Sequence, residues 1–451
     1  MLSISGRSQI LCDGIARREF LRIGGLALGG LSLPDILRAE EKAGIGSSHK
    51  SIIMVFLTGG APQMDTLDPK PEAPREIRGE FETIPTNLPG VHLCEHMPLL
   101  SRVMDRAVLL RSVVGMPEAH SAHHNLTGRS SKAPEVQPAG GWPALGSVLS
   151  RLEGPVNEAM PPFVALQRPM NVRSWSDVSP GFLGAAHAPF KPEGDALADM
   201  VLNGTSPDRL NNRKALLSDF DRFRKQIESS EKMEGVDRLT QKAFSILTSS
   251  KLLEALDISR EDESVRRLYG NGYPKLSPFS TDEYDATGNV EDFLVARRLV
   301  EAGVRCVTLN FGKWDTHGDN FRRVQNNLPL LDQGIAALIQ DIYDRGLDKD
   351  VMVVVWGEFG RTPKINSDTG RDHWPRVMSV LLAGGGMSGG TVLGATDRYA
   401  GEPVERPIHY QQIFATFYHK MGIDPKHTVL EDLSGRPHYL IEHNDPIEEL
   451  I

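Results

Sequence analysis

The stretch Ile52-Ile53-Met54-Val55-Phe56-Leu57 is followed at once by Thr58-Gly59-Gly60-Ala61-Pro62. An unbroken apolar run of this length predicts a strand that is buried on both faces of a parallel sheet. The glycines and the proline after it predict a turn at which the backbone can closely approach a ligand. We therefore expect this stretch to be the first strand of an α/β fold.

Strands and helices alternate again in the second half of the chain. Residues 293–302 read as a helix, and apolar runs at 304–309, 351–356 and 377–382 read as strands. Between the first two of these strands, apolar residues from 328 to 342 recur on one face of a long helix. The pattern predicts an α/β protein with a doubly wound, mixed or parallel sheet that helices cover on both faces. In such sheets ligands bind beyond the carboxyl ends of the strands.

Composition excludes several classes of protein. The chain has 451 residues, of which 40% are hydrophobic and 24% charged, as in an ordinary globular protein. It carries 50 Lys and Arg against 59 Asp and Glu, a formal net charge of -9, which does not favour nucleic acid or an anionic membrane as a partner. Three cysteines are too few for a disulfide scaffold.

The N-terminus is expected to be a targeting segment. Arg17-Arg18-Glu19-Phe20-Leu21-Arg22 precedes a glycine-rich apolar run, which resembles a twin-arginine (Tat) export signal. A basic helix start is the alternative. The run is about twelve residues long, too short for a stable membrane span, which needs roughly 20. We expect 1–43 to be signal and linker, the Tat translocon to be a partner during export, and the mature protein to be periplasmic or otherwise extracytoplasmic in a bacterium. Residues 44–451 are then one α/β domain, with a helical insertion at about 206–270.

Three polar motifs lie next to the later strands. Asp315 and His317 follow the strand at 304–309, and because they are two residues apart their side chains point the same way in extended chain. Glu358 and Arg361 follow the strand at 351–356. Asp372 and His373 precede the next strand. Carboxylates and imidazoles suit zinc or manganese, so we expect a shared metal or anion site.

A fourth motif, Glu118-Ala119-His120-Ser121-Ala122-His123-His124, precedes Asn125-Leu126-Thr127-Gly128-Arg129. Ser121 could simply be the N-cap of a helix. Alternatively, His120 or His124 is a metal ligand, a general acid or base, or a substrate contact.

Together these motifs resemble the family known as DUF1501 over nearly the whole chain. The resemblance rests on the paired arginines and on residues 59–70, 314–317, 357–363 and 370–375. That family is in turn similar to the alkaline phosphatase and sulfatase superfamily, whose members act on phosphate and sulfate esters with one or two metal ions. The resemblance implies an α/β sandwich of that type.

The resemblance also implies roles for individual residues. Asp315, His317 and His373, together with Asp372, would hold one metal ion, and Glu358 a second, with Asp65 as the acid near the first strand. The ions would be zinc, manganese or calcium.

This sequence departs from the superfamily pattern at three places. Glu118 stands where sulfatases have their nucleophilic Cys or Ser, and Ser121 is the only nearby hydroxyl. Phe359 stands where the late Asp-His pair has its histidine, and Asp65 is displaced from the end of the first strand.

Two functions remain open on this basis. The first is an exported metal-dependent hydrolase of phosphate or sulfate esters, with a sulfated or phosphorylated glycan as a candidate substrate. In it His120 or His124 protonates the leaving group, Arg361 clamps the anion, and the nucleophile is either Ser121 or a water activated by the metal. The second is a non-catalytic envelope protein that binds a glycan or a partner and retains the fold with a structural metal.

Overall fold

The computed structural model describes residues 50–130, 137–157, 159–167, 174, 177–192, 250–270 and 289–451. The expected signal segment, 1–43, lies outside these residues, as does the part of the expected helical insertion from 206 to 249. Within the described residues no helix is both long enough and apolar enough to cross a membrane. Residues His49–Ile451 form one compact unit.

The unit is a mixed α/β structure built around one large mixed sheet. Its eight strands are β1 (Ser51–Leu57), β4 (Ala107–Val114), β5 (Phe163–Ala165), β6 (Cys306–Phe311), β7 (Val351–Gly357), β10 (Met378–Gly384), β11 (Thr391–Leu393) and β14 (Ile408–His409). The order across the sheet is β11-β4-β10-β7-β1-β6-β5, and β14 pairs with β4 beside β11. The strands expected at the four apolar runs are therefore confirmed as β1, β6, β7 and β10.

Only β10 runs against the other strands of this sheet. It is antiparallel to both β7 and β4, whereas β1 is parallel to β6 and β7, β6 to β5, and β4 to β11 and β14. The register places Leu57 opposite both Phe311 and Gly357, so β1, β6 and β7 end at the same level. The amino end of β10 lies at that same edge of the sheet because its direction is reversed.

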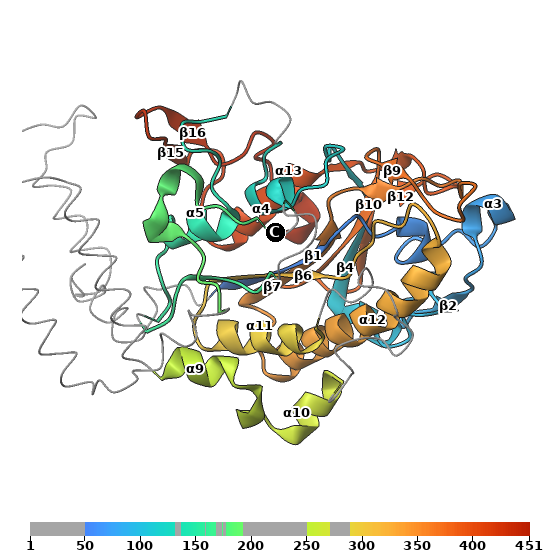
Figure 1. Ribbon diagram of the computed structural model, residues 1–451, viewed down its shortest axis with the longest axis horizontal. Coiled ribbons are helices and arrows are strands. Elements are labelled where there is room, and N and C mark those ends of the chain that lie inside the picture. The colour runs from blue at the N-terminus through green and yellow to red at the C-terminus, as the bar shows by residue number, and fades with distance from the viewer. Residues whose placement is uncertain are drawn as a thin grey trace, which may run out of the picture. The chain divides into compact units, whose positions relative to one another are not determined.

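Helices cover both faces of the sheet (Figure 1). The alternating residues of β1 show this division: Ile53 and Val55 belong to one core, and Ile52 and Met54 to the other. The first core contains α11 (Glu291–Glu301) and the long α12 (Asn320–Asp344), with α9 (Lys251–Leu256) and α10 (Glu263–Leu268) packed outside them. The second core contains α4 (His123–Thr127), α5 (Leu145–Leu152) and α13 (Tyr410–Lys420).

Small elements decorate this frame. They are α3 (Arg75–Arg78) and the two-stranded pairs β2 (Thr83–Pro85) with β3 (His92–Cys94), β8 (Gly360–Arg361) with β9 (His373–Trp374), β12 (Ala395–Thr396) with β13 (Pro403–Glu405), and β15 (Val429–Glu431) with β16 (Pro437–Tyr439). Of these, the β8–β9 hairpin matters most for the site, because it carries Arg361 and His373 on adjacent backbones.

Candidate metal centre

The polar motifs expected to lie close together do meet at one edge of the sheet. Asp315 and His317 follow β6, Glu358 follows β7, and His373 precedes the antiparallel β10. His120 comes from the segment after β4, which runs in the same direction as β6 and β7. Five chain segments that are far apart in sequence therefore contribute to one site, since the turn after β1 also reaches it.

The centre of the site is a group of four side chains that could hold a metal ion, namely His120, Asp315, His317 and His373. One carboxylate oxygen, Asp315 Oδ1, lies 3.1 Å from His317 Nε2, 3.4 Å from His120 Nε2 and 3.7 Å from His373 Nε2. The Nε2 atoms of His317 and His373 are 3.0 Å apart. Three imidazoles thus point the same ring nitrogen at one carboxylate. In the part of the chain that the structure describes, this is the one group of its kind.

The other ring nitrogen of each histidine faces a second carboxylate. His317 Nδ1 lies 2.7 Å from Asp372 Oδ1, and His120 Nδ1 lies 3.0 Å from Glu358 Oε1. His373 Nδ1 is 3.6 Å from Glu118 Oε1, within ion-pair range. Metal-binding histidines commonly donate their outer N–H to a carboxylate, which fixes the ring and raises its basicity. Each imidazole is therefore oriented as a metal ligand would be.

Asp315 is held in its ionised form. Burial alone would raise its pKa, but hydrogen bonds to His120 and His373 and the positive charge of Arg361 keep the pKa well below the usual range. Arg361 Nη2 is 2.6 Å from Asp315 Oδ1. Burial lowers the pKa of Arg361 itself, although the neighbouring carboxylate opposes this.

The structure gives Arg361 a role other than the expected anion clamp. Its side chain is fully buried, and it donates from Nε to Gly60 O, from Nη1 to Arg371 O, and from Nη2 to Gly59 O as well as to Asp315. These bonds tie the β8–β9 hairpin to the turn after β1. Arg361 therefore positions Asp315, because its guanidinium is engaged by the protein.

Glu358, expected as a ligand to a second metal ion, is fully buried and lies next to the group of four. Both of its carboxylate oxygens accept from Gly59 N at 2.9 Å, and one also bonds to His120. Gly59 has φ +97, and a Cβ there would lie 2.3 Å from Asp315 N. The glycine turn after β1 therefore lies in contact with the loop after β6 that carries Asp315. The same turn presents the Gly59 amide to Glu358.

Asp65 is not part of the group, and its surroundings argue against the expected ligand role. Its side chain is buried, and it binds the buried Arg371 through Nε at 2.7 Å and Nη2 at 2.8 Å. Asn320 Nδ2 donates to the same carboxylate at 2.7 Å. Asp65 therefore anchors the loop that carries Asp372 and His373. Asp372 itself, also expected as a ligand, contacts His317 Nδ1 on the outer side of the ring.

The remaining candidates lie at the start of α4. Ser121 Oγ accepts from His123 N at 3.1 Å, so Ser121 supports the helix start although Ala122 is the N-cap residue. His124 is fully buried, and its Nε2 bonds to the backbone oxygen of Glu358 at 2.9 Å. Of the two histidines expected as general acids, only His120 therefore reaches the group. Burial alone would lower the pKa of His120, but its hydrogen bonds to Asp315 and Glu358 raise it to about 9.

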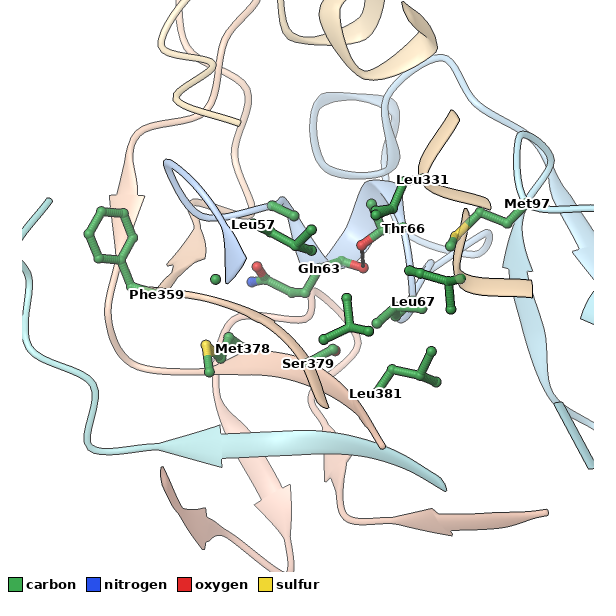
Figure 2. Close-up of a pocket in the computed structure, with 14 residues that line it drawn as sticks. Leu57, Gln63, Thr66, Leu67, Met97, Leu331, Phe359, Met378, Ser379 and Leu381 are labelled. Carbon is green, nitrogen blue, oxygen red and sulfur yellow. Dashed lines mark hydrogen bonds between the residues drawn. The ribbon is translucent and has the colours of Figure 1, made fainter. Parts of the chain in front are cut away.

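Apolar side chains pack against the site at the ends of β1 and β7. The residues that end β1 and follow β7 line a pocket shown in Figure 2, where Leu57, Phe359, Met378 and Leu381 form part of the wall. The Phe359 ring also packs against His373, with centroids 4.5 Å apart. Phe359, which stands where the superfamily has a histidine, therefore holds a ligand ring in place by packing.

The side chains of the site differ in their exposure to solvent. The side chains of His317 and Asp372 are 47% and 53% exposed, whereas His373 and Asp315 are 21% and 22% exposed and Glu358 is fully buried. His317 and Asp372 are therefore on the solvent-facing side of the group.

Two supporting residues were missed from the sequence. Glu118 pairs with His373, and Arg371 pairs with Asp65, although both stand inside motifs that drew attention for other residues. In the sequence, Glu118 is two residues before His120 and Arg371 directly precedes Asp372, so nearness to a candidate ligand could have indicated both.

The chain belongs to the family described as "Protein of unknown function (DUF1501)", whose model matches residues 49–451. No curated protein matches the sequence. Among solved structures, the chain is similar to one described as "Crystal structure of Ps i-CgsB", with 10% identity and a TM-score of 0.36 over 83% of this chain and 72% of that chain. It is also similar to Ps i-CgsB in complex with k-i-k-neocarrahexaose, with 11% identity and a TM-score of 0.35 over the same shares.

Proposed function

We propose that this DUF1501 protein is an exported metal-dependent hydrolase of phosphate or sulfate esters, with a doubly wound fold of the alkaline phosphatase and sulfatase type. The observation that carries the proposal is the convergence of three imidazole Nε2 atoms on Asp315 Oδ1, with a carboxylate behind each ring. The carboxyl-end position of this group in the sheet is where α/β enzymes bind their ligands.

The donor set fits zinc, with manganese as the second choice. Ligands about 2.0–2.1 Å from a tetrahedral zinc ion are about 3.3 Å from one another, and the distances among His317, His373 and Asp315 are 3.0, 3.1 and 3.7 Å. Calcium prefers oxygen ligands, so it is disfavoured here. We assign Asp315, His317 and His373 as the residues that would hold the ion.

A bound divalent ion would supply a Lewis acid that polarises an ester oxygen and lowers the pKa of water. His120 would then protonate the leaving group. Its Nδ1 is bound to Glu358, which turns Nε2 toward the group and keeps the ring in one orientation. The pairing of His120 with a buried carboxylate favours its protonated form, which is the form a general acid needs.

Water, rather than Ser121, is the proposed nucleophile. Ser121 Oγ accepts a hydrogen bond from His123 N at 3.1 Å and so supports the start of α4. A mechanism without a covalent intermediate also agrees with Glu118 standing at the sequence position of the sulfatase nucleophile.

One observation favours the alternative, a non-catalytic envelope protein with a structural metal. The group offers four ligand atoms, and four protein ligands close a tetrahedral zinc site, whereas catalytic zinc keeps one position open. The two functions therefore differ in what His120 does: it is a ligand in the structural site and a proton donor in the catalytic one.

The test is to isolate the protein from the compartment in which it accumulates, measure its bound metals, and assay a panel of phosphate and sulfate esters. The variants are the His317→Ala/His373→Ala double substitution and His120→Gln. The control is His427→Ala, which removes a histidine outside the site whose side chain is 83% exposed. We expect the double variant to lose the metal, and His120→Gln to keep the metal but lose turnover. If the double variant retained the metal, His317 and His373 would not be its ligands. Metal lost from His120→Gln, without turnover by the wild type, would favour the structural site.

Export is proposed from the paired arginines. Arg17→Lys/Arg18→Lys is expected to leave the protein in the cytoplasm, as measured by cell fractionation. A variant that still reached the envelope would remove the support for the Tat route.

A further inference from the structure

A second cavity, of about 600 Å³, lies beside the exposed side of the metal centre. Its lining includes Asp372 and Asn366, which both contact His317 of that centre: Asp372 bonds to His317 Nδ1, and Asn366 Nδ2 donates to His317 O at 2.9 Å. The cavity therefore begins where the site opens to solvent. Its volume is that of a typical small-molecule site.

Two aromatic side chains, Trp374 and Tyr399, form part of the cavity wall, and both are partly exposed. Trp374 directly follows His373 in β9, and its Nε1 donates to Gly401 O at 2.6 Å, which fixes the indole plane. Arg376 lies over the Trp374 ring, 5.0 Å from its centroid, and Arg398 lies over the Tyr399 ring at 4.5 Å. The apolar face of a ligand ring would therefore pack on the opposite face of either aromatic ring.

The acids that line the cavity are largely engaged by the protein. Glu402 pairs with Arg376, and Asp397 Oδ1 accepts from the backbone amides of Gly401 at 2.7 Å and of Tyr399 and Glu402 at 3.3 Å. Lys364 also lines the cavity, is exposed, and makes no ion pair with any residue that the structure describes. The wall thus offers aromatic faces and, at Lys364, a cation that forms no ion pair among the described residues.

We infer that this cavity, the Trp374 groove, binds the sugar ring next to the ester of an acidic oligosaccharide, that is, a sugar chain that carries sulfate or phosphate esters. A sugar ring has an apolar face that would lie on Trp374 or Tyr399, and an anionic substituent would pair with Lys364. The inference rests on the proposed ester hydrolase function and names the substrate class of that same site.

The test is an array of oligosaccharides in sulfated, phosphorylated and unmodified forms, probed with the purified protein and followed by calorimetric titration of the sugars that bind. We expect Trp374→Ala and Tyr399→Ala each to weaken binding by about tenfold or more, the equivalent of 1.4 kcal/mol. Lys364→Gln should weaken binding of the esterified sugar but not of its unmodified counterpart. Tyr439→Ala, at an exposed aromatic on the β15–β16 hairpin, is the matched control.

Small aryl phosphates and sulfates separate this inference from the proposed function, because they do not extend into the groove. Turnover of a small ester by Tyr399→Ala, together with lost oligosaccharide binding, supports the groove. Binding unchanged in both aromatic variants, or no binding by the wild type across the array, overturns it even if the small esters are hydrolysed. Binding that depends on the groove, without metal or turnover, would instead retain the groove and reject the hydrolase.

Discussion

The Nε2 atoms of His317 and His373 are 3.0 Å apart, although His317 precedes β7 in the sequence and His373 follows it. Two imidazole nitrogens at this distance either share one proton or face a common cation. Asp372 contacts Nδ1 of His317, which raises the basicity of Nε2 and makes it a better metal ligand. This contact favours a shared cation over a shared proton. The separation therefore links metal affinity to a carboxylate that lies outside the group of four.

Asp372→Asn is accordingly expected to weaken zinc binding by about 10–100-fold, the usual effect of losing such a partner. A competition titration with a chelating dye measures it. The matched control is Asp368→Asn, at an exposed carboxylate in the same loop. If both variants bound zinc as the wild type does, Asp372 would have no influence on His317.

Gly59→Ala is expected to disturb the site from the turn after β1. A Cβ there would lie 2.3 Å from Asp315 N. The backbone at Gly59 has φ +97, a conformation that residues other than glycine rarely adopt. We expect a loss of stability of at least about 1–3 kcal/mol from the backbone conformation alone, together with weakened zinc binding as Asp315 moves. Gly90→Ala separates the two causes, since Gly90 has φ +78 but no atom within 4 Å of the added Cβ. Equal effects of the two substitutions on metal binding would show that the contact with Asp315 is unimportant.

The sheet edge that carries the site could be predicted because it follows from local patterns. Buried parallel strands such as β1 and β7 are continuous apolar runs, and their carboxyl ends must lie together. Asp315, His317 and His373 were therefore correctly expected to be close neighbours.

The roles of the supporting residues could not be predicted in the same way. Whether a carboxylate faces a metal position or the outer nitrogen of a histidine depends on how loops fold over one another. Glu358 meets His120 across 238 positions of sequence, and Asp65 meets Arg371 across 306. Neither spacing nor periodicity carries that information, so Asp65 and Glu358 were assigned as ligands from resemblance alone.

Asp65→Asn tests the structural role that the geometry gives to this carboxylate. Arg371 is fully buried, so removal of its partner leaves an uncompensated charge, and we expect a loss of about 3–5 kcal/mol in the free energy of unfolding. Urea denaturation measures the loss. Asp445→Asn, which breaks the exposed pair with Lys426, should cost no more than about 1 kcal/mol. The folded Asp65→Asn protein should still bind zinc; loss of zinc with unchanged stability would restore Asp65 as a ligand.

Glu261 joins the segment before α10 to α11 and α12 through ion pairs with Arg297, Arg298 and Arg345. Burial alone would raise its pKa, but hydrogen bonds from Arg297 and Arg298 and the charge of Arg345 hold it at about 2, against an ordinary value of 4.5. A carboxyl group with a lowered pKa stabilises the folded state above its unfolded pKa and loses that contribution as the pH falls through the folded pKa.

Glu261→Gln should therefore cost on the order of 3 kcal/mol at neutral pH, from about 1.36 kcal/mol per unit of pKa. The difference from the wild type should stay constant down to about pH 4.5 and shrink between there and pH 2, because the wild-type carboxylate becomes protonated in that interval. Urea denaturation at a series of pH values measures both curves. Glu263→Gln, at an exposed pair with Arg267, is the control and should differ little from the wild type at any pH. A Glu261→Gln deficit that persisted undiminished at acid pH would arise from lost packing, and the charge network would then not be what holds α10 against α11 and α12.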